Sequence, residues 1–246
     1  MIIKVLTYNI HHGADGAQKY KLEAICAIIK ASGADIVGIQ EIDRSWSQRS
    51  NWEDQVTILS GALGMEFAFA ASIELPPADP GRPNRQFGNG LFSKYPILSP
   101  QVHHMYVCDD PSMVYDGTRE TEPRSVLEAK IDLEGKEISV LCTHLSVHSQ
   151  KERLRQVGKL EGIIGKIDGS LILLGDFNAS FDSEELVRLR RILAEPSFEK
   201  GLITKPDESR QIDYILVRDL NVEEIKVLDS DASDHLPLLA TIQLPL

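Results

Sequence analysis

The chain has 246 residues, of which 42% are apolar and 26% charged, a composition typical of an ordinary soluble globular protein. Asp and Glu outnumber Lys and Arg by 37 to 26, so the formal net charge is −11. Because a surface of this sign repels phosphate backbones, tight and sequence-independent binding to long nucleic acid is disfavoured, although a local basic patch could still support it.

The first forty residues predict a β-α-β unit. Residues 2–8 are rich in β-forming side chains and predict a mostly buried strand. Between Tyr20 and Ser32 apolar residues recur at helical spacing, and Gly33 follows as a stop signal. Residues 35–40 then predict a second short, buried strand.

The rest of the chain alternates between further helices, strands and two long loops. Three more helices are predicted over about 53–63, 150–167 and 183–193. Strands are predicted at 66–71, 89–93, 125–133, 137–143, 170–175, 212–217, 222–228 and 237–244. The loops, 74–87 and 107–123, are polar or proline-rich and of a length that is usually functional or mobile. This mixture of hairpins and β-α-β connections indicates a layered α/β fold with mixed sheets.

We expect one domain over residues 1–246, because no repeat, low-complexity tract or interdomain linker interrupts the pattern. The first ten residues lack the features of a signal peptide, and no run comes near the roughly 18 apolar residues of a transmembrane helix. The cysteines, Cys26, Cys108 and Cys142, are far apart and form no CxxC pair. A cytoplasmic protein with reduced cysteines is therefore expected.

Side chains suited to metal binding or proton transfer stand at six strand ends. They are Asn9, Glu41, His144, Asp176 with Asn178, Asp213, and Asp234 with His235. One such case, as in LLGDFNAS at 173–180, is typical of a turn, because Gly, Asp and Asn favour turns. Six cases are hard to ascribe to turns. Since loops at strand ends converge in layered α/β folds, we interpret the set as one site.

The residue types in this set indicate a hard cation and an attack on phosphate. Carboxylates and carboxamides without a thiolate suit Mg²⁺, which prefers oxygen ligands and keeps several waters. Two histidines and a further carboxylate remain for proton transfer and phosphate contact. The chain contains no GxSxG elbow and no Walker-type loop, so serine-hydrolase and P-loop chemistry have no support. The combination favours metal-assisted hydrolysis of a phosphate ester by activated water.

Seven segments resemble motifs of the endonuclease/exonuclease/phosphatase superfamily, in the same order and context. They are TYNIHHG, IQE, GNGLFSKYP, THL, GDFNA, IDYIL and SDHLPL. Members of this superfamily include deoxyribonuclease I, abasic-site endonucleases, neutral sphingomyelinases and inositol polyphosphate 5-phosphatases. The resemblance covers nearly the whole chain and implies a four-layer α/β sandwich, the deoxyribonuclease I-like fold. In that fold two mixed β-sheets pack face to face with helices outside, and the site lies at one edge.

The resemblance also implies the metal site and the histidine pair. Glu41 and Asn9 resemble the ligands of the principal Mg²⁺, for which Mn²⁺ can substitute, and Asp234 resembles a further carboxylate of the metal site. Asp213 resembles the partner that orients His235. Such a pair acts as a base or as a charged phosphate clamp.

Three further residues resemble groups that act on the attacking water and the phosphate. Asp176 corresponds to the residue that aligns or deprotonates the water, Asn178 to a hydrogen-bond donor to the transition state, and His144 to a contact of a non-bridging phosphate oxygen. Either Asp176 or the Asp213–His235 pair could take the proton of the water. We hypothesise that Asp176 does so.

Arg124 and Asn89 are candidate substrate-binding residues. Arg124 matches a frequent superfamily arginine near the start of a strand, with a solvated strand-edge arginine as the alternative. The sequence departs from the abasic endonucleases at His11, which stands where they usually carry an aspartate. For His11 and the adjacent His12 we favour surface positions without a role.

Two aromatic residues follow the metal-site glutamate. Trp46 and Trp52 flank a polar loop just after Glu41. They could line a substrate cleft or pack in the core.

The leading hypothesis is a Mg²⁺-dependent phosphoesterase that hydrolyses a phosphodiester or phosphomonoester by in-line attack of water. The acidic charge favours a small-molecule or lipid-head-group substrate. The alternative is a nuclease or DNA-repair phosphodiesterase of the same superfamily, and a catalytically inactive binding module is a third hypothesis. No feature of the sequence predicts an oligomeric state.

Overall fold

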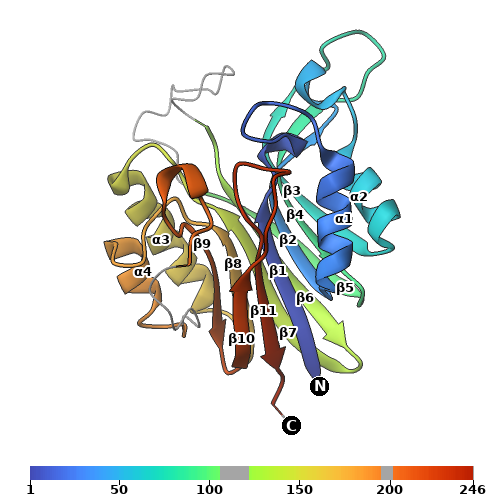
Figure 1. The fold of residues 1–246 in the computed structure, drawn as a ribbon. Coiled ribbons are helices and arrows are strands. Elements are labelled where there is room, and N and C mark those ends of the chain that lie inside the picture. The colour runs from blue at the N-terminus through green and yellow to red at the C-terminus, as the bar shows by residue number, and fades with distance from the viewer. Residues whose placement is uncertain (106–121, 195–201, 246) are drawn as a thin grey trace.

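Two mixed β-sheets form the centre of the protein in a computed structural model that describes residues 1–105, 122–194 and 202–245 (Figure 1). The six-stranded sheet has the order β10-β11-β1-β2-β4-β3, and the five-stranded sheet has the order β5-β6-β7-β8-β9. The strands are β1 (Ile2–Asn9), β2 (Ile36–Arg44), β3 (Glu66–Leu75), β4 (Arg85–Ser93), β5 (Ile97–His104), β6 (Ser125–Leu133), β7 (Lys136–His144), β8 (Leu171–Asp176), β9 (Asp213–Arg218), β10 (Asn221–Val227) and β11 (Leu238–Gln243).

Helices cover the outer face of each sheet. The α-helices are α1 (Leu22–Ser32), α2 (Gln55–Leu63), α3 (Gln150–Ile164) and α4 (Glu184–Leu189), and short 3₁₀ turns are η1 (His11–Gly13), η2 (Gln48–Ser50) and η4 (Pro206–Glu208). In Figure 1, α1 and α2 lie on one side of the pair of sheets, and α3 and α4 on the other. In the described part of the chain, no helix is both long and apolar enough to cross a membrane.

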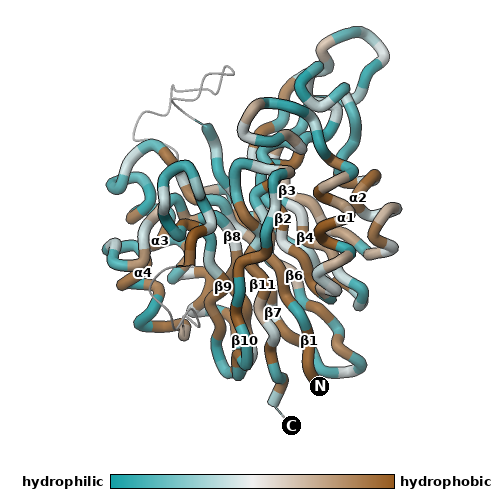
Figure 2. Tube along the Cα trace, viewed as in Figure 1, coloured by the Kyte–Doolittle hydropathy of each residue, from teal (hydrophilic) through white to brown (hydrophobic). Residues whose placement is uncertain are grey.

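Three buried apolar clusters hold these four layers together. One lies between the sheets and includes Val5, Val140 and Leu174. A second, with Ile25, packs α1 and α2 against the six-stranded sheet, and the third packs α3 and α4 against the five-stranded sheet. Figure 2 shows the apolar residues concentrated in the strands and the polar residues in the loops. The predicted four-layer α/β sandwich is therefore confirmed.

Capping groups define the start of α3 and the end of α1, and the second is the predicted stop signal at Gly33. The Ser149 hydroxyl accepts a hydrogen bond from the backbone N–H of Glu152 at 3.2 Å, which satisfies a donor at the start of α3. Helix α1 ends at Gly33, whose φ of 69° lies in the left-handed region that glycine adopts without a steric penalty. Helices α3 and α4 end earlier than predicted, at Ile164 and Leu189.

The strand predictions were wrong at one edge of the fold. β5, at Ile97–His104, was not predicted, because its side chains are mostly exposed and it contains Pro100, a residue that sheets tolerate at edges and bulges. β3 and β4 extend into the predicted loop 74–87, which shortens to residues 76–84. Most of the other predicted loop, 107–123, lies outside the described residues.

The topology brings six chain segments to one edge. β1 and β2 are parallel, as are β7 and β8, and their carboxyl ends lie at the upper edge in Figure 1. Since β9 runs antiparallel to β8, and β11 to β1, the first residues of β9 and β11 lie at that edge too. Asp176 is consequently a register partner of both His144 and Asp213.

Candidate active site

A cavity of about 310 Å³ opens at this edge of the two sheets. The predicted site residues that line it are Glu41, Arg124, His144, Asp176, Asn178, Asp234 and His235. Asn9 and Asp213 are not among the lining residues, but they are hydrogen-bonded to Glu41 and His235, which are. Asn89 does not line the cavity. It is 1% exposed on β4, and its amide donates to the Ser125 carbonyl at 2.9 Å, which links the two sheets.

Gly175 allows the end of β8 to approach β7 closely. Its φ is 147°, and a Cβ atom there would lie 1.9 Å from the backbone oxygen of Thr143. No side chain larger than hydrogen fits without moving one of the two strands. Glycine at this position therefore fixes where the next residue, Asp176, enters the cavity.

Residues with positive φ gather around the cavity. Glu41 has φ 61° at a break in the pairing between β2 and β4, and Asn178 has φ 48° just after β8. His11 and His12 have φ 46° and 48°. Non-glycine residues in this region are uncommon, and when they cluster they often mark functional sites.

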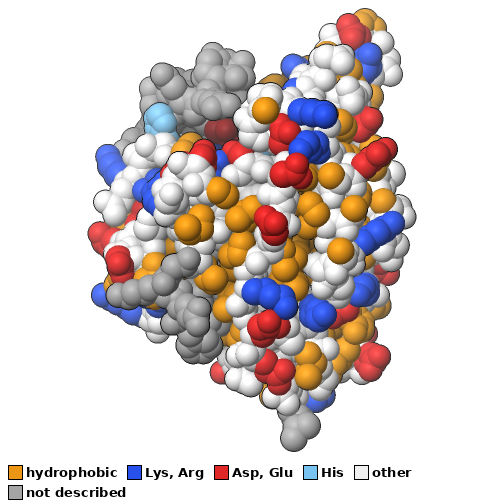
Figure 3. Space-filling model, viewed as in Figure 1, with side chains coloured by type: hydrophobic (Ala, Val, Ile, Leu, Met, Phe, Trp, Pro, Cys, Tyr) orange, Lys and Arg blue, Asp and Glu red, His pale blue; other side chains and the backbone are white. Residues whose placement is uncertain are grey.

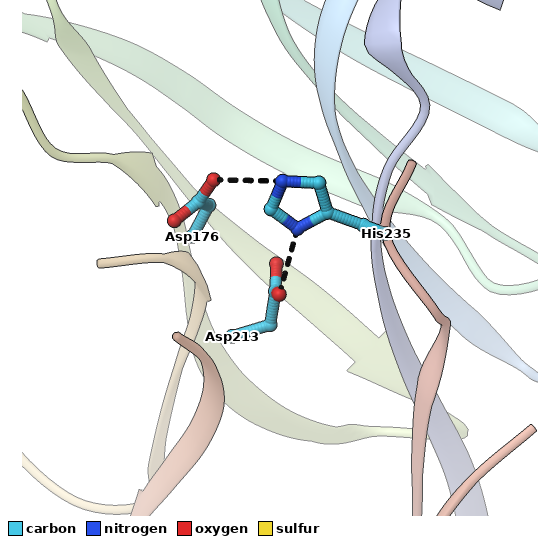
Figure 4. Close-up of side chains that lie close together, drawn as sticks. All are labelled: Asp176, Asp213 and His235. Carbon is cyan, nitrogen blue, oxygen red and sulfur yellow. Dashed lines mark hydrogen bonds and ion pairs between the residues drawn. The ribbon is translucent and has the colours of Figure 1, made fainter. Parts of the chain in front are cut away.

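Asp176, His235 and Asp213 form a buried chain of charged groups (Figure 4). Nδ1 of His235 lies 2.9 Å from Oδ2 of Asp213, and Nε2 lies 3.7 Å from Oδ2 of Asp176. Burial by itself disfavours the imidazolium ion, but the charges of both carboxylates and the Asp213 hydrogen bond outweigh it and raise the pKa of His235 to about 10. Burial and the charge of Asp213 raise the pKa of Asp176 to about 7. At neutral pH the structure thus holds a charged imidazole between two carboxyl groups.

His144 is held as a neutral N–H donor beside Asp176. Nη1 of Arg124 lies 2.9 Å from His144 Nδ1, and because a guanidinium group can only donate, Nδ1 accepts. Burial, and then the nearby charges of Arg124 and His235, lower the pKa of His144 well below its usual range. The ring proton therefore lies on Nε2, and its acceptor is Asp176 Oδ2 at 3.4 Å. The amide nitrogen of Asn178, 3.1 Å from Nε2, is itself a donor and donates to the Leu145 carbonyl at 3.0 Å.

Arg124 is 4% exposed, which excludes the alternative of a solvated strand-edge arginine. Its Nη1 also lies 2.6 Å from Glu122, and its Nε has no hydrogen-bond partner among the described residues. A buried donor without a partner costs free energy unless a ligand or water satisfies it. This guanidinium lines the cavity and so has spare donor capacity at the site.

Asn9 connects the two sheets through its amide nitrogen. That nitrogen donates to Glu41 Oε1 at 3.0 Å and to Asp176 Oδ2 at 3.0 Å, while Oδ1 accepts from the backbone N–H of His11. Burial favours the neutral acid at Glu41, but the Asn9 hydrogen bond and the charge of Arg124 lower the pKa of that carboxyl group. Glu41 is therefore ionised, and its Oε2 accepts no hydrogen bond from a described residue.

The oxygen donors at the cavity fit a hard divalent cation. Among the described residues that line the cavity, five are carboxylates, three are Lys or Arg, and none is a thiol. One oxygen or nitrogen atom from each of Asp176, Asp213 and His235 lies within 4.8 Å of the others. The charged imidazole of His235 already neutralises the two carboxylates there and cannot bind a metal ion while it is protonated. Glu41 and Asp234, which also line the cavity, are the better candidates for a metal centre.

Lys205 is a site residue that the sequence analysis missed. It is 8% exposed, lines the cavity and forms an ion pair with Asp234. Burial opposes the charge of Lys205, yet the bond to Asp234 raises the pKa of its ammonium group. In the sequence, Lys205 is a single lysine in the loop segment LITKPDES and belongs to no motif. Its ion pair with Asp234 forms only when the chain folds.

Other residues of the cavity wall, which also includes His11, were misjudged, left open or not named from sequence. His12 is 6% exposed, so the prediction of a surface position is wrong for it. Trp46 lines the cavity, whereas Trp52 contacts Arg82 outside it. Arg49, which had not been singled out, also lines the cavity.

Comparison with known proteins agrees with the fold. A UPF0294 protein of Vibrio campbellii is 28% identical over 130 residues, which are 50% of this chain and 46% of that protein. The matched segment thus spans about half the length of that relative. An endonuclease/exonuclease/phosphatase of Beutenbergia cavernae superposes with a TM-score of 0.78 at 21% identity, over 99% of this chain and 72% of that one.

A mannosyl-6-phosphatase of Bacteroides thetaiotaomicron superposes with a TM-score of 0.71 at 17% identity, over 98% of this chain and all of that one. At such identities the structural likeness shows the fold alone. The sequence profile of the Endonuclease/Exonuclease/phosphatase family, however, matches residues 6–235, which is nearly the whole chain. The protein therefore belongs to the endonuclease/exonuclease/phosphatase family.

Proposed function

We propose that the protein is a Mg²⁺-dependent phosphoesterase that hydrolyses a small phosphate ester by in-line attack of water. The observation that carries this proposal is the arrangement of Asp176 between the charged His235 and the neutral donor His144, in one cavity with the ionised Glu41. A carboxylate flanked by two imidazoles suits the positioning of a water nucleophile next to a phosphoryl group.

Glu41 would hold the metal ion, together with Asn9 and Asp234. When bound, Mg²⁺ or Mn²⁺ would supply positive charge against the phosphoryl oxygens. Glu41 fits this role because Oε2 is free of hydrogen bonds from described residues, and because the described residues that line the cavity include more carboxylates than Lys and Arg side chains. Asn9 fixes the other oxygen of Glu41, and Lys205 holds Asp234 at the same cavity.

Asp176 would orient the attacking water and accept its proton. Both of its oxygens are already fixed, Oδ1 by the backbone N–H of Asn178 at 2.8 Å and Oδ2 by Asn9 at 3.0 Å. His235 is a poor acceptor in this role, because Asp213 keeps its imidazole charged. The charged His235 and the neutral N–H of His144 are instead suited to bind non-bridging phosphate oxygens, with the amide of Asn178 beside them.

The substrate we propose is a small molecule or a lipid head group. A cavity of about 310 Å³ is at the small end of the range for ligand pockets and matches a compact phosphate ester. On the face shown in Figure 3, the described Lys and Arg side chains are interspersed with Asp and Glu and form no continuous basic strip. Both features favour a small ester over a nucleic-acid duplex, which requires an extended basic surface.

The test is hydrolysis with and without Mg²⁺ or Mn²⁺, with His235→Ala as the blank. The panel contains an aryl phosphodiester, an aryl phosphomonoester, a lipid phosphodiester, a hexose 6-phosphate, plasmid DNA and abasic-site DNA. We expect metal-dependent turnover of a small ester that is absent in the blank. Cleavage of DNA alone would replace the proposal with a nuclease, and binding of metal without any turnover would indicate an inactive binding module.

A further inference from the structure

The cavity wall contains a second guanidinium group that the proposed hydrolysis does not use. Arg49 lies on η2, in the segment that follows β2, and lines the same cavity as Asp176 and His235. Its side chain is 37% exposed, whereas the carboxylate that anchors it, Asp43, is fully buried. The positive end of this pair therefore faces the cavity.

Asp43 holds the guanidinium of Arg49 by one edge. Nε of Arg49 donates to Oδ2 of Asp43 at 2.9 Å, and Nη2 donates to Oδ1 at 2.7 Å. Asp43 is itself fixed, because the Ser50 hydroxyl donates to Oδ2 and Gln55 accepts from the Asp43 backbone N–H. A paired geometry of this kind pre-orients the guanidinium plane, so little side-chain entropy is lost when it binds a ligand.

Two aromatic rings flank the same guanidinium. Its Cζ lies 5.3 Å from the centroid of Trp46 and 5.3 Å from that of Phe87, and the two ring centroids are 5.8 Å apart. Both rings also line the cavity. Such contacts restrain the arginine and exclude water from one side of it, which strengthens its interaction with an anion.

The remaining edge of Arg49 is free to bind a ligand. Nη1 has no hydrogen bond to any described residue, and Nη2 uses only one of its two hydrogens for Asp43. Arginine can donate but cannot accept, so a ligand must present oxygen or nitrogen acceptors there. The free Nη1–Nη2 edge has the fork geometry that matches two oxygens of a carboxylate or a phosphate.

We propose that Arg49 binds a second anionic group of the substrate, a carboxylate or phosphate that lies apart from the scissile phosphate. This inference rests on the proposed function, because it assigns the scissile phosphate to the Asp176–His235 end of the cavity. Arg49 thereby selects doubly anionic esters over singly anionic ones. Trp46 and Phe87, which flank Arg49 and line the same cavity, bound the space next to this second anionic group.

Turnover of matched esters tests this selection. Methyl 4-nitrophenyl phosphate is compared with its 2-carboxyethyl, 3-carboxypropyl and 2-phosphoethyl counterparts, which share one leaving group. We expect at least one doubly anionic ester to have a kcat/KM at least about tenfold above that of the methyl ester, through a lower KM. Arg49→Gln combined with Asp43→Asn should abolish that preference, so that within this variant the kcat/KM values of the doubly anionic esters and of the methyl ester agree to within about twofold.

The double substitution avoids leaving Asp43 as an unpaired buried charge, and Arg49→Lys retains the charge without the planar fork. Arg49→Lys should lose most of the preference while the protein stays folded. Arg82→Gln is the matched control, because Arg82 stacks on Trp52 and pairs with Asp79 but does not line the cavity. A preference that survives in the double variant, or the absence of any preference in the parent enzyme, would overturn the proposal.

Binding can be measured without turnover. Trp52→Phe leaves Trp46, beside Arg49, as the remaining tryptophan, and its fluorescence is followed during titration with ethylphosphonate or 2-carboxyethylphosphonate in Mg²⁺. We expect the carboxylated phosphonate to bind at least about tenfold more tightly, and this difference to vanish in the double variant. Equal binding of the two probes would refute the subsite alone. Failure of both probes to bind would refute the phosphate site and the proposed function with it.

Discussion

Nδ1 of His235 lies 2.9 Å from Oδ2 of Asp213, so a single hydrogen bond joins the loop before β11 to the first residue of β9. The two residues are 22 positions apart, and the bond crosses between the sheets. Oδ1 of Asp213 is buried and has no partner among the described residues. The charge of Asp213 is thus directed mainly at His235, which explains why the histidine pKa rises despite its burial.

Asp213→Asn should retain the shape of this pair and remove its charge. The amide oxygen can still accept from Nδ1, but the pKa of His235 should fall because its strongest favourable charge is lost. We expect kcat to fall by at least about 100-fold with a smaller change in KM. Steady-state kinetics and an NMR titration of the His235 ring check this. The control is Asp168→Asn, an exposed carboxylate between α3 and β8. An unchanged His235 pKa would contradict the assigned role of Asp213.

Glu41→Gln should weaken divalent-metal binding. Gln still accepts the hydrogen bond from Asn9, but it lacks the negative charge that attracts a hard cation. Calorimetric titration with Mg²⁺ or Mn²⁺ should show an affinity at least about tenfold lower than in the unchanged protein. Glu208→Gln is the matched control, because Glu208 also lines the cavity but is paired with Arg210. Equal losses in the two variants would mean that the cavity attracts metal only through its overall charge.

The sequence predicted the layers of the fold and the strand-end residues, because both follow from local patterns. A strand that ends on Asp176 is visible in the order of apolar and polar residues, whereas β2 continues past Glu41 to Arg44. The edge strand β5 and the ion pair between Lys205 and Asp234 were missed, since each depends on partners distant in the sequence. Asn89 was assigned to the substrate from its neighbours along the chain, although its amide links the two sheets.

Gly175→Ala should destabilise the protein and reduce its activity together. The added Cβ would lie 1.9 Å from the Thr143 backbone oxygen, and φ of 147° is unfavourable for alanine. We expect the free energy of unfolding to fall by at least about 2 kcal/mol, because β7 and β8 must separate. Gly162→Ala is the control: a Cβ there meets nothing within 4 Å, and alanine in α3 should stabilise by about 0.5–1 kcal/mol. Denaturant unfolding measures both, and a neutral Gly175→Ala would show that Asp176 does not depend on this close approach.

His12 should make the stability of the protein depend on pH below neutrality. Burial, and then the charge of Arg49, lower the pKa of His12 to about 4 in the folded chain. The unfolded chain, with an ordinary histidine pKa near 6.5, therefore binds a proton over a pH range in which the folded protein does not. By linkage, this site lowers the free energy of unfolding as the pH falls from about 6.5 to 4, by about 3 kcal/mol in total.

His12→Asn removes this titration and suits the backbone, because asparagine tolerates the φ of 48° at this position. Urea unfolding at pH 7.5 and 4.5 should show that the unchanged protein loses about 2–3 kcal/mol more stability than His12→Asn over this interval. His104→Asn, at an exposed position on β5, controls for the loss of one histidine from the chain. If His12→Asn lost as much stability as the unchanged protein, the pH dependence would have to arise from other residues. The lowered pKa of His12 would then not contribute to it.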